Sequence, residues 1–386
     1  MPNDEWIQQK LNAISEAGRL RNLRALPGAG GMINAGGRHI INFSSNDYLD
    51  LAQHPDVVEM SRRYAGTYGA GSTASRLVCG TLACHEELEA RLAAFKQYPA
   101  ALLFGSGFMA NAGVIPTLVS REDTVYADKL AHASILDAVT LSRARLRRFR
   151  HNDPEHLNDL LGKHSTGRAL VVVESVYSMD GDLAPLSALK DIADRHGAML
   201  MVDEAHATGI FGPEGRGCVN ALRENGPVDV SMGTLSKALG GYGGFIACSE
   251  ALRDLLVNTS RAFIYTTAPP PAAAGAALGA LDVLEREPER GAQLLRQAAH
   301  FRQLLQNAHL NTMQSESQII PILIGDNERA VQIARALEQQ DIIAVAIRPP
   351  TVPEGSARIR LSVTRDHTEQ DLTRATEVIA ATVHRY

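Results

Sequence analysis

Short, almost entirely apolar runs alternate with amphipathic stretches between residues 85 and 247, and this alternation limits the possible folds more than any other feature. The clearest runs are Ala169–Glu174 and Ala198–Asp203, each aliphatic until a final carboxylate. A strand without a polar face is buried on both sides, as in parallel sheets whose connecting helices cover both faces. The sequence therefore predicts an α/β protein built on a large, mostly parallel sheet.

The other expected elements continue this pattern and then change in character after residue 284. Strands of the first part are expected at 40–43, 100–104, 124–126, 228–232 and 244–247. Its helices are expected at 5–24, 86–96, 134–141, 186–196 and 272–284, with one more opening at Gly107. Helices at 285–308, 329–340 and 369–383 and strands at 319–324, 342–347 and 359–363 indicate a smaller α+β lobe. We expect an N-terminal segment at 1–45, a large domain at 46–284 and a small C-terminal domain at 285–386.

The charge and the cysteines argue against several classes of protein. The formal net charge is −5, so no basic surplus indicates a nucleic-acid partner. The one basic run, five arginines between 143 and 150, is interpreted as a solvated helix end or an edge strand. The four cysteines form no CxxC pair, and neither a disulfide framework nor a metal site is expected. No signal peptide or membrane span is recognisable, which predicts a cytoplasmic protein.

One lysine, Lys237, stands among small residues in the segment 231–244, three residues after Thr234. Upstream, Asp203 ends a buried strand and His206 follows three residues later. An amine for a Schiff base, a carboxylate for the pyridine nitrogen and polar groups for the ring oxygen and phosphate are what pyridoxal phosphate (PLP) needs. Taken singly, Lys237 is a typical surface lysine and Asp203 a typical helix cap. Together they predict a PLP site at the carboxyl edge of the sheet.

Three further features belong at this edge. The segment 105–107, Gly-Ser-Gly, follows a strand and opens a helix, where backbone amides can bind a phosphate. Ala110 occupies the place of the third glycine of a dinucleotide fingerprint, so an NAD-dependent oxidoreductase is a poor second interpretation. His132 follows a strand and can stack on a flat cofactor, the alternative being a satisfied core histidine. Ser178 comes soon after the strand that ends at Glu174.

Two arginines, Arg358 and Arg360, lie on an expected strand of the smaller lobe. Because side chains alternate along a strand, we expect one of them to point inward and the other toward solvent. An arginine beside the proline-rich loop 348–353 is suited to bidentate recognition of a carboxylate. Considered alone, each arginine is a typical surface charge.

Taken together, these segments resemble the α-oxoamine synthases, which are fold-type I PLP enzymes that join an amino acid to an acyl-CoA with loss of CO₂. The resemblance covers essentially the whole chain. Residues 42–49 and 346–353 discriminate within the family and are most similar to its biotin-synthesis branch. Asp50, Thr73 and Ala74 depart from the usual pattern and concern the acyl-chain preference.

The resemblance implies a role for individual residues. Lys237 carries the Schiff base and moves a substrate proton, while Asp203 pairs with the pyridine nitrogen and His206 bonds the phenolic oxygen. His132 stacks on the ring, contacts substrate and takes part in catalysis. The remaining cofactor contacts are Gly107, Phe108, Ser178, Thr234 and, from the second subunit of a homodimer, Thr266 or Thr267. The remaining substrate contacts are Arg360 for the amino-acid carboxylate, Asn46, Thr351, and Arg21 or Arg24.

The reaction implied by the resemblance is a decarboxylative condensation of L-alanine with pimeloyl-CoA or a pimeloyl carrier protein, at an active site on the subunit interface. A second interpretation keeps the fold and uses glycine with acetyl-CoA, or another amino acid and acyl-CoA. A PLP-fold protein used only for binding or regulation is disfavoured, because Lys237 and Asp203 are both present.

Overall fold

The computed structural model describes residues 4–222 and 226–386, which group into two compact units. The large unit spans Asn46–Ser178 and Asp182–Leu295. The small unit contains residues 4–45, Met179–Gly181 and Arg296–Tyr386. The domain boundaries expected from the sequence stay a prediction.

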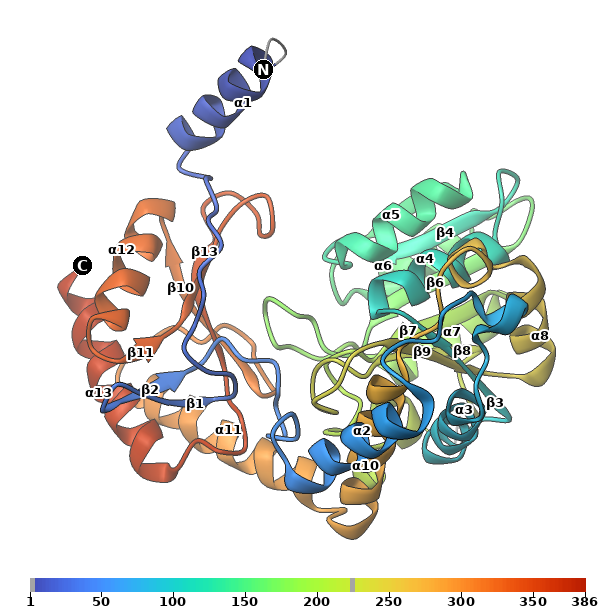
Figure 1. Ribbon diagram of the computed structural model, residues 1–386. Coiled ribbons are helices and arrows are strands. Elements are labelled where there is room, and N and C mark those ends of the chain that lie inside the picture. The colour runs from blue at the N-terminus through green and yellow to red at the C-terminus, as the bar shows by residue number, and fades with distance from the viewer. Residues whose placement is uncertain (1–3, 223–225) are drawn as a thin grey trace. The chain divides into compact units, whose positions relative to one another are not determined.

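The large unit is built on a seven-stranded sheet in the order β3-β9-β8-β7-β6-β4-β5 (Figure 1). Its strands are β3 (Ala100–Phe104), β4 (Thr124–Asp128), β5 (Arg145–Phe149), β6 (Ala169–Glu174), β7 (Met199–Asp203), β8 (Val230–Thr234) and β9 (Gly244–Cys248). All pairings are parallel except those of β9, which runs antiparallel to β3 and β8. The predicted mostly parallel sheet is therefore confirmed, and the arginine run forms its edge strand β5.

Both faces of this sheet are buried, as the apolar strands predict. Leu170 and Val172 of β6 pack in one hydrophobic cluster with α4 (Gly107–Leu118), α5 (Ala133–Ser142) and α8 (Glu250–Thr259). Val171 and Val173 pack in a second cluster with α6 (Pro154–Leu161) and α7 (Leu186–Arg195). Alternate side chains of one strand thus enter opposite cores.

The other helices of the large unit are α2 (Pro55–Tyr68), α3 (Ala83–Lys96), α9 (Arg261–Ile264) and α10 (Pro271–Arg286). Helices α2 and α10 lie side by side (Figure 1). The glycines of α10 permit this approach, since a Cβ at Gly275 would lie 2.6 Å from the Met60 carbonyl oxygen. The helix expected at 285–308 is instead the end of α10 and α11 (Arg290–Asn307). Pro288 lies in the break, and the residue before a proline avoids helical angles.

The small unit contains two three-stranded sheets. One has the order β1-β2-β11, formed by β1 (Met32–Ala35), β2 (Arg38–Asn42) and β11 (Ile342–Ile343). The other is antiparallel, in the order β10-β13-β12, formed by β10 (Ile319–Gly325), β12 (Val345–Ile347) and β13 (Ala357–Ser362). The remaining helices are α1 (Glu5–Glu16), α12 (Asn327–Glu338) and α13 (Glu369–Arg385).

Helix α1 is shorter than the helix expected at 5–24. It ends at Glu16, and Gly18 then takes a φ of +63°, a conformation that glycine adopts readily. Among residues 4–222 and 226–386, no helix combines the length and the apolar composition that a membrane crossing requires.

Candidate active site

The carboxyl ends of neighbouring strands in the large unit bring the chemically active side chains together. Glu174 at the end of β6 pairs with Asp203 at the end of β7, and Asp203 pairs in turn with Met232 of β8. Lys237 follows β8 within three residues of its end. The candidate site is therefore at the edge of an α/β sheet where ligands usually bind.

The amine of Lys237 lies in a chain of hydrogen bonds. Lys237 Nζ is 2.8 Å from His206 Nε2, and His206 Nδ1 is 2.8 Å from the Tyr48 hydroxyl. Tyr48 donates its only hydroxyl proton to Asn46 Oδ1 at 3.0 Å, so His206 Nδ1 donates to the Tyr48 oxygen. This leaves the lone pair of His206 Nε2 facing the lysine amine. Asn46, predicted as a substrate contact, thus lies in the large unit within the same network as Lys237.

The carboxylate of Asp203 is almost fully buried, with both oxygens bound. Oδ1 accepts from the backbone amide of Ala205 at 2.9 Å, and Oδ2 accepts from Asn111 Nδ2 at 3.0 Å. Asp203 caps no helix, so the alternative considered for it is wrong. Asn111 was missed at the sequence level, although an asparagine inside the apolar helix α4 was a visible signal.

His132 is the N-cap of α5 and is held as a neutral ring. Its Nδ1 accepts from the Ser134 backbone amide at 3.2 Å and lies 2.8 Å from the Ser134 hydroxyl. Asn111 Nδ2 donates to that hydroxyl at 2.9 Å, which links His132 to Asp203. Burial lowers the pKa of His132; Asp203 opposes this shift and Lys237 adds to it. A neutral ring that accepts at Nδ1 carries its proton on Nε2.

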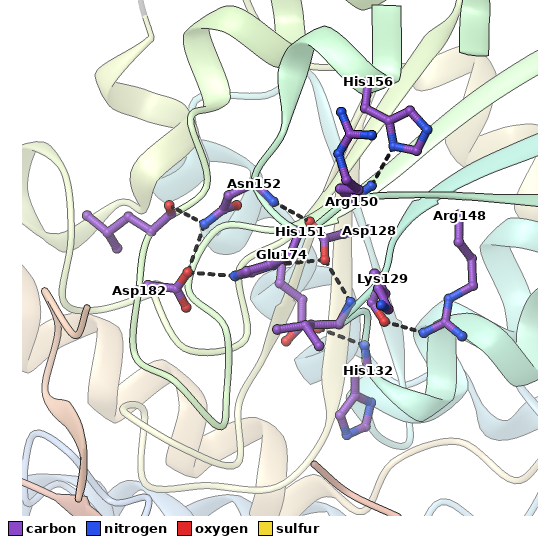
Figure 2. Close-up of polar contacts among 12 residues, drawn as sticks. Asp128, Lys129, His132, Arg148, Arg150, His151, Asn152, His156, Glu174 and Asp182 are labelled. Carbon is purple, nitrogen blue, oxygen red and sulfur yellow. Dashed lines mark hydrogen bonds and ion pairs between the residues drawn. The ribbon is translucent and has the colours of Figure 1, made fainter. Parts of the chain in front are cut away.

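The carboxyl group of Glu174 supports this histidine from the end of β6. Glu174 Oε1 accepts from the backbone amide of His132 at 2.7 Å (Figure 2). Burial, and then the charge of Asp203, raises the pKa of Glu174 well above its ordinary value. Two neighbouring buried carboxyl groups disfavour two negative charges, which is the physical cause of this rise.

The predicted phosphate-binding residues lie near the N-terminus of α4. Gly107 is the first residue of that helix, and its added Cβ would lie 3.6 Å from the Cβ of Thr234. The Thr234 hydroxyl donates to the Gly243 carbonyl at 2.8 Å. Gly244 of β9 lies close to the backbone at the start of α4. A Cβ added at Gly244 would lie 2.6 Å from the Gly107 amide nitrogen, so glycine permits this close approach.

Three other predicted cofactor contacts differ in exposure. Ser178 is nearly buried, just beyond the bridge that joins Val176 to Leu183. Phe108 is 48% exposed, and Thr267 is exposed in an antiparallel bridge with Ser75.

The predicted substrate residues Arg21, Thr351 and Arg360 belong to the small unit. Arg21 and Thr351 are exposed, and Arg24 is paired with Glu338 of α12. Arg360 is 6% exposed, with its guanidinium 2.9 Å from the Ser362 hydroxyl.

The expectation that one of Arg358 and Arg360 faces solvent is wrong. Arg358 is only 2% exposed and forms an ion pair with Asp180. Residues two apart on a strand share a face, so both side chains of β13 point to the same buried side.

A family model described as aminotransferase class I and II matches residues 38–379. The chain belongs to this family. It is 46% identical to the 8-amino-7-oxononanoate synthase of Geobacter sulfurreducens, with 97% of each chain covered. A structure of serine palmitoyltransferase from S. paucimobilis with a bound PLP–myriocin aldimine has a TM-score of 0.92 at 29% identity, covering 100% of this chain and 98% of that one. An 8-amino-7-oxononanoate synthase structure from Francisella tularensis has a TM-score of 0.77 at 32% identity, covering 90% and 98%. Membership of the aminotransferase class I and II family excludes the NAD-dependent alternative.

Proposed function

We propose that the chain is a PLP-dependent acyltransferase that condenses L-alanine with a pimeloyl thioester, releasing CO₂ and the thiol carrier. The product is 8-amino-7-oxononanoate, an intermediate of biotin synthesis, and the expected location is the cytoplasm. The observation that carries this proposal is the 46% identity to the Geobacter sulfurreducens enzyme over 97% of both chains.

The side chains of the large unit fit PLP. The carboxylate of Asp203 is nearly buried, and its two hydrogen-bond donors, Asn111 and the Ala205 amide, are both neutral. Such a carboxylate suits a protonated pyridine nitrogen, which supplies a positive charge. The amine of Lys237 suits a Schiff base, and the start of α4 with Thr234 suits a phosphate. When bound, PLP withdraws electrons from the substrate Cα and so stabilises the carbanion formed there.

Side chains of the protein transfer the substrate protons and hold the protonated groups in place. Lys237 Nζ removes the Cα proton of bound alanine and later returns a proton to the product. Asp203 keeps the pyridine nitrogen protonated, and Asn111 holds the Asp203 carboxylate in place. His132, neutral with its proton on Nε2, donates a hydrogen bond to the thioester oxygen as negative charge develops there.

We assign substrate recognition to four of the predicted residues. Arg360 binds the amino-acid carboxylate, a role suited to a guanidinium held on a buried strand. Asn46 contacts the substrate near Lys237, while Thr351 and Arg21 contact the acyl group. Arg24 is the weaker candidate because Glu338 already binds it.

A homodimer is part of the proposal, with Thr267 reaching the cofactor of the second subunit. Large apolar side chains of the large unit are exposed, namely Leu77, Val78, Phe108, Tyr242 and Tyr265. Exposed apolar side chains are typical of an interface where they form one contiguous patch. Light scattering of the purified protein is expected to give twice the chain mass of 41.6 kDa.

A second candidate is an α-oxoamine synthase with a different amino acid and acyl-CoA. The observation in its favour is the TM-score of 0.92 to serine palmitoyltransferase, against 0.77 to the Francisella tularensis synthase. Mass spectrometry of products from alanine, glycine and serine, each with pimeloyl, acetyl and palmitoyl thioesters, separates the two. The proposal expects alanine with the pimeloyl thioester to dominate; a dominant glycine or serine product would contradict it.

A further inference from the structure

A histidine that the proposed chemistry does not use lies between two buried carboxylates. His151 follows β5, and its Nδ1 is 2.9 Å from Asp128 Oδ1 at the end of β4. Its Nε2 is 2.7 Å from Asp182 Oδ2 (Figure 2). Asp128 is fully buried and Asp182 is 7% exposed.

The two contacts decide the charge of the ring. Carboxylate oxygens only accept hydrogen bonds, so both ring nitrogens must carry a proton and the ring is an imidazolium. Burial by itself lowers the pKa of His151, but Asp128 and Asp182 outweigh it and raise that pKa to about 10. The centroids of the His151 and Tyr177 rings are 4.5 Å apart, and the two ring planes are nearly perpendicular. Burial, and then nearby carboxylates, raises the pKa of Tyr177 well above its ordinary value, so the phenol stays neutral.

The carboxylate of Asp128 organises the turn that leads to His132. Its Oδ1 accepts from the Leu130 backbone amide at 2.7 Å, and its backbone carbonyl accepts from the Ala131 amide at 3.1 Å. Its Oδ2 accepts from the Asn152 amide at 2.9 Å. The position of His132 therefore depends on where this carboxylate is held.

The carboxylate of Asp182 belongs to the hairpin that carries Ser178. The Asp182 carbonyl accepts from the Tyr177 amide at 3.1 Å, next to the bridge between Val176 and Leu183. Asn152 Nδ2 reaches this hairpin as well, donating to Asp182 Oδ2 at 2.8 Å and to the Leu183 carbonyl at 3.0 Å.

We propose that His151 is a positioning residue whose imidazolium joins the Asp128 turn to the Asp182 hairpin, and so holds His132 and Ser178 in place for the cofactor. This inference rests on the proposed function, because it concerns the same PLP site. The positive charge of His151 stabilises this contact, because the buried carboxylates of Asp128 and Asp182 would otherwise repel each other.

The test compares His151→Gln with the double variant His151→Gln/Asp182→Asn. The first leaves Asp128 and Asp182 without a cation, and the second removes one of the two negative charges. Asp182→Asn alone keeps His151 and is the milder variant if the first folds poorly. His196→Gln is the matched control, since His196 is exposed and bonds Asn158 at 3.0 Å.

Three readouts are needed: the PLP dissociation constant of the apoenzyme by equilibrium dialysis, the thermal unfolding of the apoenzyme against pH, and kcat and KM separately. His151→Gln is expected to weaken PLP binding by roughly 10- to 100-fold, by analogy with the loss of a group that orients a metal ligand. The double variant is expected to recover most of this loss, and His196→Gln to match the wild type.

The pH dependence has a definite sign. The pKa of His151 is raised in the folded protein, so its stabilisation is complete below the ordinary histidine pKa and is lost as the pH rises through about 10. Apoenzyme with His151→Gln is expected to lack this alkaline loss. A variant that is less stable yet binds PLP like the wild type would overturn the positioning role. Wild-type protein that does not bind PLP would instead refute the proposed function.

Discussion

Lys96 and Lys237 are two lysines of the large unit with opposite surroundings. Lys96, at the end of α3, is fully buried and donates to the equally buried carboxylate of Glu204 and to the Arg216 carbonyl. Lys237 instead faces the nitrogen of an imidazole, His206. Lys96 is held in one geometry by a buried carboxylate, whereas Lys237 shares a hydrogen bond with an imidazole, a group that can accept or donate a proton. The first arrangement suits structure and the second suits chemistry.

Both surroundings depend on one tetrapeptide, residues 203–206, which begins at the last residue of β7. Glu204 binds Lys96, and it also accepts from the Val219 amide and the Ser231 hydroxyl, both at 3.0 Å. Asp203 and His206 belong to the candidate active site. The buried ion pair therefore anchors the segment that presents the catalytic groups, and the two lysines can be tested separately.

The largest expected effect comes from Lys237→Ala. Loss of the amine that moves the Cα proton is expected to lower kcat by at least about a thousandfold. The visible absorbance of the bound cofactor is expected to change, while the circular dichroism spectrum stays that of the wild type. The measurement is product formation from alanine and the pimeloyl thioester, and normal turnover would contradict the role of Lys237.

The next effect is on stability, from Lys96→Met. This change leaves the charge of Glu204 buried and uncompensated, which costs about 3–5 kcal/mol of unfolding free energy. Urea unfolding of the apoenzyme measures it, with kcat per folded molecule expected to stay close to the wild-type value. Lys163→Met, at an exposed lysine, is the control and is expected to change stability by less than about 0.5 kcal/mol.

The double variant Lys96→Met/Glu204→Gln sharpens this result. Removal of both charges is expected to restore most of the stability, because a neutral buried side chain needs no counter-ion. Glutamine keeps an oxygen that can accept from the Val219 amide. If the double variant is no more stable than Lys96→Met, the ion pair is not the source of the loss.

The smallest effect is a shift in the titration of His132. Its pKa is lowered in the folded protein, so its neutral form contributes stability above the ordinary histidine pKa, and this contribution is lost as the pH falls toward the lowered value. Lys237→Ala removes one cause of the shift and is expected to raise the pKa of His132. Lys96→Met is expected to leave it unchanged. Nuclear magnetic resonance of labelled histidines in the apoenzyme measures both.

Strands β3 and β6 were predictable because an almost entirely apolar run is stable only where both of its faces are buried. Ala100–Phe104 and Ala169–Glu174 match the predicted strands residue for residue. The ends of helices α1 and α10 were misplaced by the sequence analysis. The apolar spacing continues beyond Gly18 and Pro288, whereas the helical backbone ends before each of these residues. The expectation for Arg358 failed for a different reason. Residues two apart on a strand lie on the same face, so Arg358 and Arg360 are buried together.

By itself, the sequence determined the sheet, the cofactor class and the residue types at the strand ends, because local patterns and short spacings encode them. Only the tertiary structure decided the partners of each charged group. Asn111 reaches Asp203 across 92 positions, Lys96 reaches Glu204 across 108, and Tyr48 reaches His206 across 158. Hydrogen bonds between residues so far apart depend on how strands and helices pack, and these bonds set the surroundings of each lysine and of each histidine.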